Sequence, residues 1–267
     1  MAKISESERL EFTQAVKPYK QKVVEVLEKE KTILNAIRAN CDDIPSQKIG
    51  LCEDMLYLST LYMAQNSISL EMLGIKNNDA LNDSRKVLYR AVIYLEDLVS
   101  NFIDVSYSEL KDKYEAIKHI SLEKRYSLVR KLGLAINLLE EAFGDNSKWK
   151  WSFVELKGRF VVVAKNLLDM RTYAQDYFDP NSPNYEITTE YVKMLNELLE
   201  SSAASYRDKY ELSTRRLDDI RNAIKFLLAR HKLAMAIGDK TYAEEIKKKA
   251  LVWRDKMDAD AKAGSSR

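Results

Sequence analysis

The chain has 267 residues and contains only 7 glycines and 4 prolines. Because these helix-breaking residues are so few, most of the chain is expected to lie in long helices, which argues against a β-rich fold. The 43 basic and 41 acidic residues leave a net charge of only +2, so the composition also argues against a nucleic-acid-binding protein that acts through bulk charge.

Apolar residues at helical spacing predict three long helices in the first 105 residues. These helices cover residues 5–40, 46–73 and 80–105. Pro18 lies inside the first of them and is expected to kink or restart it near Val16. The weaker pattern of residues 108–120 predicts a short helix, and Ser121 is expected to cap a longer one that ends at Gly144.

The most apolar turn of the chain follows this helix. Phe160 to Ala164 are five consecutive apolar residues, which sweep more than one helical turn and leave it no face suited to water. Asp145 or Ser147 is expected to cap the helix that contains them, and Pro180 cannot continue it. We therefore predict a buried central helix over residues 146–178.

The polar segment 179–184 is the strongest break in the chain and a candidate linker or subdomain boundary. Residues 187–237 then contain no glycine or proline and carry apolar residues in steps of three and four. The small residues 201–205 weaken this seam, so either two helices meet there or a neighbour crosses one helix closely; one long, bent helix is predicted. A last helix is expected over 241–258, followed by a disordered tail, 259–267.

These segments predict an all-α protein of about seven or eight antiparallel helices, arranged as a bundle or a short solenoid of helical hairpins. Residues 1–180 are expected to form a helical bundle around the 146–178 helix. Residues 185–258 are expected to supply a long helix and a terminal hairpin that pack on this bundle, most simply within one continuous domain.

The segment 233–251 resembles the turn and second helix of a tetratricopeptide (TPR) repeat. The residues that carry the resemblance are Ala234, Ala236, Gly238, Asp239, Ala243, Ala250 and Leu251. Lys247 stands where that family has an aromatic residue, and no second copy is visible at a period near 34 residues. The resemblance implies a tight terminal helical hairpin, and a peptide-binding groove is a further implication of it.

Two groups of residues are candidates for contact with a partner. The first, Lys148, Trp149, Lys150 and Trp151, alternates basic residues with indoles that suit either a protein partner or nucleic-acid bases. On a helix the two indoles point about 200° apart, so the simpler alternative is that they pack against neighbouring helices. The second group comprises Tyr206, Tyr210, Arg215 and Arg216, which we expect to be exposed along a groove beside the long helix.

Ten basic residues gather in the last two predicted helices. They are Arg215, Arg216, Arg221, Lys225, Arg230, Lys232, Lys247, Lys248, Lys249 and Arg254. Acidic residues four positions away, such as Asp219 for Arg215 and Glu244 for Lys248, are typical of a solvated helix face. Binding of an acidic partner or of nucleic acid is the alternative.

No motif for catalysis, cofactor binding or metal binding is recognisable. His119 and His231 are the only histidines and Cys41 and Cys52 the only cysteines, and none of them stands at metal-ligand spacing. The longest charge-free run, 55–70, is too short and too polar to span a bilayer. A cytoplasmic protein that is not an enzyme is therefore expected, without a cofactor.

The sequence predicts a non-catalytic protein-interaction module, an adaptor or scaffold, that binds a helix or peptide of a partner in a groove between helices. Two alternatives remain open. One is nucleic-acid binding through the C-terminal basic cluster, and the other is a homo-oligomeric structural protein whose long seam is occupied by a second copy of the chain.

Overall fold

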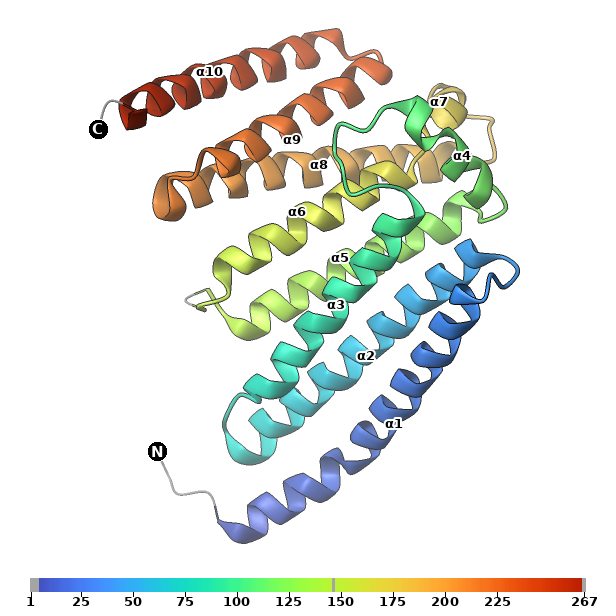
Figure 1. The fold of residues 1–267 in the computed structure, drawn as a ribbon, viewed down its shortest axis with the longest axis vertical. Coiled ribbons are helices and arrows are strands. Elements are labelled where there is room, and N and C mark those ends of the chain that lie inside the picture. The colour runs from blue at the N-terminus through green and yellow to red at the C-terminus, as the bar shows by residue number, and fades with distance from the viewer. Residues whose placement is uncertain (1–4, 146, 266–267) are drawn as a thin grey trace. The chain divides into compact units, whose positions relative to one another are not determined.

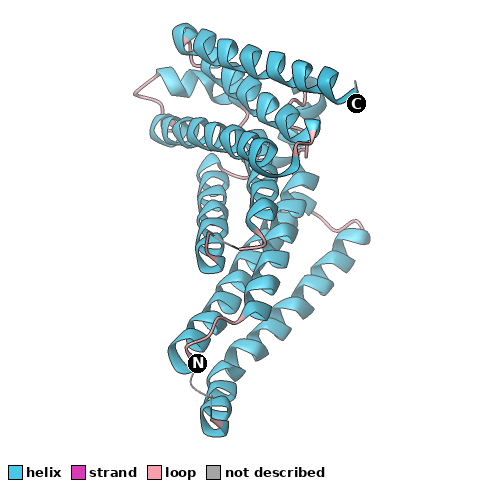
Figure 2. Ribbon diagram, turned by 90° about the vertical axis from the view of Figure 1, so that its left-hand side faces the viewer, coloured by secondary structure: helices cyan, strands magenta, loops and turns pink. Residues whose placement is uncertain are grey.

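The computed structural model describes residues 5–145 and 147–265. These residues form helices joined by short loops and contain no strand (Figure 2). The helices are α1 (Glu6–Arg38), α2 (Ile44–Leu73), α3 (Asn78–Leu98), α4 (Tyr107–Ile117), α5 (Leu122–Phe143), α6 (Lys150–Leu167), α7 (Met170–Phe178), α8 (Tyr185–Lys209), α9 (Leu217–Ala236) and α10 (Lys240–Ser265), with a π-helical segment, η1 (Tyr210–Thr214), after α8. The all-α class is confirmed, but ten α-helices in this described part exceed the seven or eight predicted.

The chain divides into two compact units, each assembled from two separate segments. Unit 1 comprises Met1–Leu98 and Ser127–Lys150, and unit 2 comprises Val99–Tyr126 and Trp151–Arg267. The segment 179–184, at which the sequence suggests a boundary, lies inside unit 2, where it joins α7 to α8. Over the described residues, none of the helices combines the length and apolar character needed to cross a membrane.

In unit 1, α1, α2 and α3 pack in sequence as antiparallel neighbours (Figure 1). Ser5 and Glu8 form a capping box that starts α1, which confirms the predicted start of this helix. The helix continues through Pro18 to Arg38, so of the two predicted outcomes the restart near Val16 is wrong, and the kink stays a prediction. The proline removes one backbone donor, and the turns on either side of it hold the helix together.

A buried ion pair fastens α1 to α3. Glu30 of α1 is 4% exposed, and its carboxylate accepts hydrogen bonds from the Arg90 guanidinium and from the Tyr94 hydroxyl, each at 2.5 Å. Burial and the neighbouring carboxylate raise the pKa of Tyr94 well above its ordinary value. Because both carboxylate oxygens have donors, the charge is compensated inside the unit.

In unit 2, α6 is the buried helix that the sequence predicts. Val161, Val162 and Val163 are 1%, 7% and 0% exposed, and they are helical. The helix ends at Leu167, however, and α7 begins at Met170. The single helix predicted over 146–178 is therefore wrong beyond residue 167.

Side chains distant in sequence stabilise the end of α6. The Tyr191 hydroxyl of α8 donates to the Ala164 carbonyl at 2.9 Å, and the buried Arg125 guanidinium donates to the Leu167 carbonyl at 2.8 Å. Asp169 then has extended backbone and accepts from the Arg171 amide, which starts α7. These bonds satisfy carbonyls that a continuous helix would use internally, so the chain turns here despite its apolar sequence.

Residues 187–237 form two helices, so the predicted long helix is wrong as well. The break lies at 210–216, after the small residues 201–205, which remain inside α8. Arg215 has φ of +52°, and the Thr214 hydroxyl donates to the buried Asp219 at 2.5 Å while accepting from the Arg216 amide. Asp219 also pairs with Lys209 at 3.0 Å. This cluster stabilises a turn that brings α9 back along α8 (Figure 1).

The chain ends in a hairpin of α9 and α10 that turns at Gly238, whose φ is +78°. The terminal hairpin expected from the sequence is therefore present, and α10 packs along α9. This last helix extends to Ser265, so the prediction of disorder is wrong for residues 259–265, while 266–267 lie outside the described residues.

Candidate functional site

The structure buries the first of the candidate tyrosines, Tyr206. Its side chain is 6% exposed, stacks on Phe226 with ring centroids 5.6 Å apart, and lies against Gly158 of α6. The expectation that Tyr206 is exposed along a groove is wrong, because the glycine lets the ring approach the α6 backbone.

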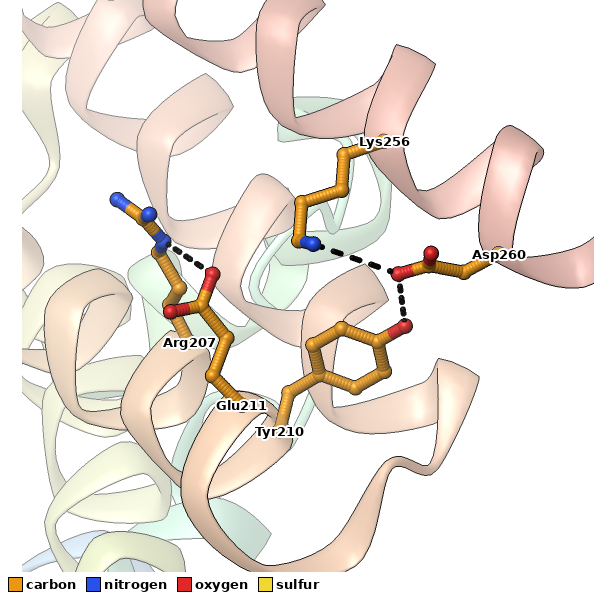
Figure 3. Close-up of polar contacts among 5 residues, drawn as sticks. All are labelled: Arg207, Tyr210, Glu211, Lys256 and Asp260. Carbon is orange, nitrogen blue, oxygen red and sulfur yellow. Dashed lines mark hydrogen bonds and ion pairs between the residues drawn. The ribbon is translucent and has the colours of Figure 1, made fainter.

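Tyr210 is also buried, at 2% exposed, and its polar end already has a partner. Figure 3 shows its hydroxyl donating to Asp260 of α10 at 2.5 Å, with Lys256 3.6 Å from the same carboxylate oxygen. Desolvation and Asp260 raise the pKa of Tyr210 to about 12, and the hydroxyl lowers the pKa of Asp260. Tyr210 therefore joins η1 to α10, at a residue beyond the helix end predicted at 258.

Arg215 and Arg216 are exposed at the turn between η1 and α9, as expected. The Arg215 guanidinium carbon lies 6.0 Å from the ring centroid of Tyr210, and Arg216 precedes the first turn of α9. These two cations are accessible, but the tyrosines predicted to accompany them are not. The expected groove beside a long helix is therefore not formed by this set of residues.

The alternating Lys–Trp segment lies at the start of α6. Trp149 is half-buried in the preceding turn, where the Arg85 guanidinium carbon lies 3.9 Å from its ring centroid. Lys148 and Lys150 are exposed, and Trp151 is half-buried. Since one face of the Trp149 ring is occupied by Arg85, this indole has a packing role within unit 1.

Several residues of the C-terminal basic cluster pair with acids, although not with those the spacing suggests. Arg230 is 7% exposed and pairs with Glu200 of α8 at 2.7 Å. Asp219 pairs with Lys209 instead of Arg215, and Glu244 pairs with Lys247 instead of Lys248. The pairings predicted for Arg215 and Lys248 are therefore wrong, because Lys209 reaches Asp219 across the η1 turn and Lys247 lies on the next turn of α10 from Glu244.

A groove in unit 1, which we name the α1 groove, lies between α1, α2 and the start of α3. Its volume is about 880 Å³. It is lined by Phe12, Lys20, Val23 and Val24 of α1, by Tyr62, Gln65, Ser69 and Leu73 of α2, and by residues 75–80 and Asp83 of the α2–α3 turn and α3. From Phe12 to Val24 it runs along about 18 Å of helix.

The α1 groove combines uncovered apolar side chains with charges of both signs. Val24 is 54% and Ile75 41% exposed, so both present apolar surface to solvent. Within the described residues, Lys20 and Asp79 have no ion-pair partner. The side-chain amide nitrogen of Gln65 is buried with no hydrogen-bond partner.

One signal for this groove was present in the sequence. Val23 and Val24 are adjacent in the apolar stripe of α1, and adjacent helical residues point about 100° apart. Val23 is 7% exposed and Val24 is 54% exposed, so the packing of α1 covers only one of the two. The polar lining residues from the α2–α3 turn gave no comparable signal, because only the turn brings them beside α1.

Comparison with known proteins identifies a family, but the name of this family states no activity. The model of the TP0443 family matches residues 8–261. Among solved structures, a chain described as "DHF58 filament" is similar at 14% identity, with 97% of this chain and 99% of that chain covered and a TM-score of 0.39. No curated protein matches the sequence.

Proposed function

Because the chain belongs to the TP0443 family, whose name states no activity, we propose a function from the geometry of the chain itself. The protein is a non-catalytic interaction module that holds an amphipathic helix of another protein in the α1 groove. The observation that carries this proposal is the exposure of Val24 and Ile75 along a lined groove of about 880 Å³.

The length and lining of the groove favour a helix as the occupant. About 18 Å of α1 corresponds to roughly three helical turns, so a partner helix of about 12 residues matches it. Such a helix would place apolar residues at steps of three and four against Val24 and Ile75, as in other helix-in-groove complexes. Burying these two side chains removes apolar surface from water, which is the main favourable contribution to association.

Lys20 and Asp79 of the groove indicate which charged residues the occupant carries. Lys20 on α1 requires an acidic residue of the occupant, and Asp79 on α3 requires a basic one, so the proposed helix carries both signs beside its apolar stripe. A purely apolar segment would leave these groups desolvated without partners.

Site-specific photo-crosslinking tests the proposal. A photo-reactive amino acid replaces Val24 in cells, and the same replacement at Leu134, which is 59% exposed on α5 of the same unit, is the control. We expect one segment of a partner protein to crosslink at position 24 and not at position 134. A synthetic peptide of that segment should gain helicity on binding.

The same peptide then tests the groove by mutation. Val24→Glu should weaken its binding about tenfold or more, because a carboxylate would be placed against the apolar stripe, whereas Leu134→Glu should have no effect. Equal binding to both variants, or no crosslink specific to position 24, would contradict the proposal. A crosslink to a second copy of this chain would favour the homo-oligomeric alternative in its place.

A further inference from the structure

A second cavity lies in unit 2, at the break between α6 and α7. Its volume is about 200 Å³, below the roughly 300–1,000 Å³ typical of drug-sized ligands. The apolar part of its lining is Val105, Leu110, Leu168, Met170, Leu195, Ala229, Leu233 and Ala236. Its polar part is Tyr107, Tyr114, Lys165, Asp169, Arg171 and Lys232. Helices that are distant in sequence therefore line a small cavity whose walls are partly apolar and partly cationic.

Three cations line this cavity without a carboxylate partner. None of Lys165, Arg171 and Lys232 has an ion pair within the described part of the chain. The Lys165 ammonium donates to the Ile103 carbonyl and to the Asn166 side-chain oxygen, both at 3.0 Å. These acceptors are neutral and use two of its three donors, and Asp104 attracts the ammonium without forming an ion pair, so one donor remains and the charge is only partly compensated.

The one carboxylate in the lining, that of Asp169, is engaged elsewhere. Its Oδ1 accepts from the Arg171 amide at 3.0 Å, and its Oδ2 accepts from the Thr172 hydroxyl at 2.5 Å. The carboxylate therefore caps α7 and forms no ion pair with either lysine, and its negative charge also lies in the lining. The Arg171 guanidinium carbon lies 3.9 Å from the ring centroid of Tyr107, a contact that orders this side chain at the cavity.

We propose that this cavity binds a small organic anion, whose charged group is held by Lys165, Lys232 and Arg171 and whose apolar body contacts the leucine-rich wall. Carboxylates and phosphate monoesters share this chemistry, since both accept charge-assisted hydrogen bonds from ammonium and guanidinium groups. The ligand is small, because the cavity has room for only a short chain.

The electrostatics of the cavity support the proposal. Burial and the charge of Lys232 lower the pKa of Lys165 to about 8, while Asp104 opposes this effect. An anion bound between the two lysines would compensate both charges, so its binding is coupled to protonation of Lys165. The other titratable or charged groups that line the cavity are Tyr107 and Tyr114 on α4, Asp169 before α7, Arg171 on α7 and Lys232 on α9.

Ligand titration of the full chain tests this inference with four probes: hexanoate, hexyl phosphate, inorganic phosphate and neutral hexanol. We expect hexanoate or hexyl phosphate to raise the thermal midpoint of unfolding in a saturable manner and hexanol to have no effect. The stronger of the two anions identifies the preferred head group. Saturation by inorganic phosphate alone, or equal effects of hexanol and hexanoate, would contradict an amphiphilic anion site.

Lys165→Met tests the cation assignment, with Lys193→Met, an exposed lysine of α8 outside the cavity, as the matched control. Lys165→Met should weaken the binding of the preferred anion about tenfold or more, and Lys193→Met should leave it unchanged.

The affinity of the wild-type protein for the anion should also fall as the pH rises through about 8, because Lys165 loses its proton. Should Lys165→Met not fold, Lys232→Met at an exposed position carries the same test. Unchanged affinity in the folded variant would overturn the proposal.

Discussion

Tyr206 of α8 lies directly against Gly158 of α6. A Cβ atom placed on Gly158 would meet Cε2 of Tyr206 at 2.6 Å and its hydroxyl oxygen at 2.7 Å. The ring cannot retreat easily, because it also stacks on the Phe226 ring. This glycine therefore sets the separation of α6 and α8, and the buried position of Tyr206 depends on it.

Gly158→Ala should destabilise the protein by about 1–3 kcal/mol through overpacking, although alanine is the better helix former. Gly50→Ala is the matched control, since Gly50 lies inside α2 and a Cβ there meets nothing within 4 Å. The control should be stabilising by up to about 1 kcal/mol. Urea denaturation followed by circular dichroism measures both. Destabilisation of the two variants by equal amounts would show that Tyr206 does not restrict residue 158.

Glu30→Gln should destabilise unit 1 by about 1–3 kcal/mol, because it leaves the Arg90 guanidinium without its buried counter-charge. A destabilisation near the lower end of this range, about 1 kcal/mol, is expected because the Arg90 side chain is 37% exposed. Glu25→Gln removes an exposed partner of Lys22 on the same helix and should have no measurable effect. Denaturation midpoints distinguish the two, and equal midpoints would mean that the buried pair contributes no more than a surface pair.

Tyr210→Phe should loosen the C-terminal part of α10, because it removes the hydroxyl that donates to Asp260. Amide hydrogen exchange at residues 256–263 should accelerate about fivefold, which corresponds to the loss of one ordinary hydrogen bond. Tyr57→Phe, at an exposed tyrosine, is the control. Unaltered exchange in Tyr210→Phe would show that other contacts hold this end of the helix.

The same contact has a defined pH dependence. Tyr210 has its pKa raised to about 12 and so stabilises the fold fully below its ordinary value of 10.0, with the contribution lost as the pH rises towards 12. Asp260 has a lowered pKa and contributes above its ordinary value of 3.8, with loss as the pH falls through the lowered value. The difference between wild type and Tyr210→Phe should therefore be constant between about pH 5 and 9.

Lys165 should make the stability of the ligand-free protein rise with pH. Its pKa is about 8 in the folded chain against an ordinary 10.5, so between these values the unfolded state binds the additional proton. The free energy of unfolding then increases with pH across this window, by up to about 3 kcal/mol. Lys165→Met should lack this rise relative to wild type in urea denaturation series at pH 7.5 and 10. Parallel pH profiles would contradict a desolvated lysine.

The predicted helices whose ends depend on local signals are found where the sequence places them. Helix α1 begins directly after its cap Ser5, close to the predicted start, and the Ser121 hydroxyl accepts from the Lys124 amide at the start of α5, where a cap was predicted. Each of these bonds joins residues only three positions apart, so the pattern is visible in the sequence. Gly238 likewise marks the terminal turn, because its positive φ is one that other residues rarely adopt.

The candidate site was predicted less well, because the exposure of a side chain depends on the helices that pack around it. The sequence positions of Tyr206 and Tyr210 were compatible either with an exposed groove or with the core. Contacts with Gly158 and Asp260 place both side chains in the core. The α1 groove forms where Val23 is buried and Val24 stays exposed. The pattern of residues within α1 does not indicate which of these two valines becomes buried.

The sequence by itself determined that this is an all-α protein with Val161, Val162 and Val163 buried, because sparse breakers and helical periodicity act within a few turns of chain. Only the tertiary structure decided where the long apolar segments end. Arg125 and Tyr191 reach carbonyls at the end of α6 from other helices, and a helix can stop inside an apolar run only when such donors replace its internal hydrogen bonds.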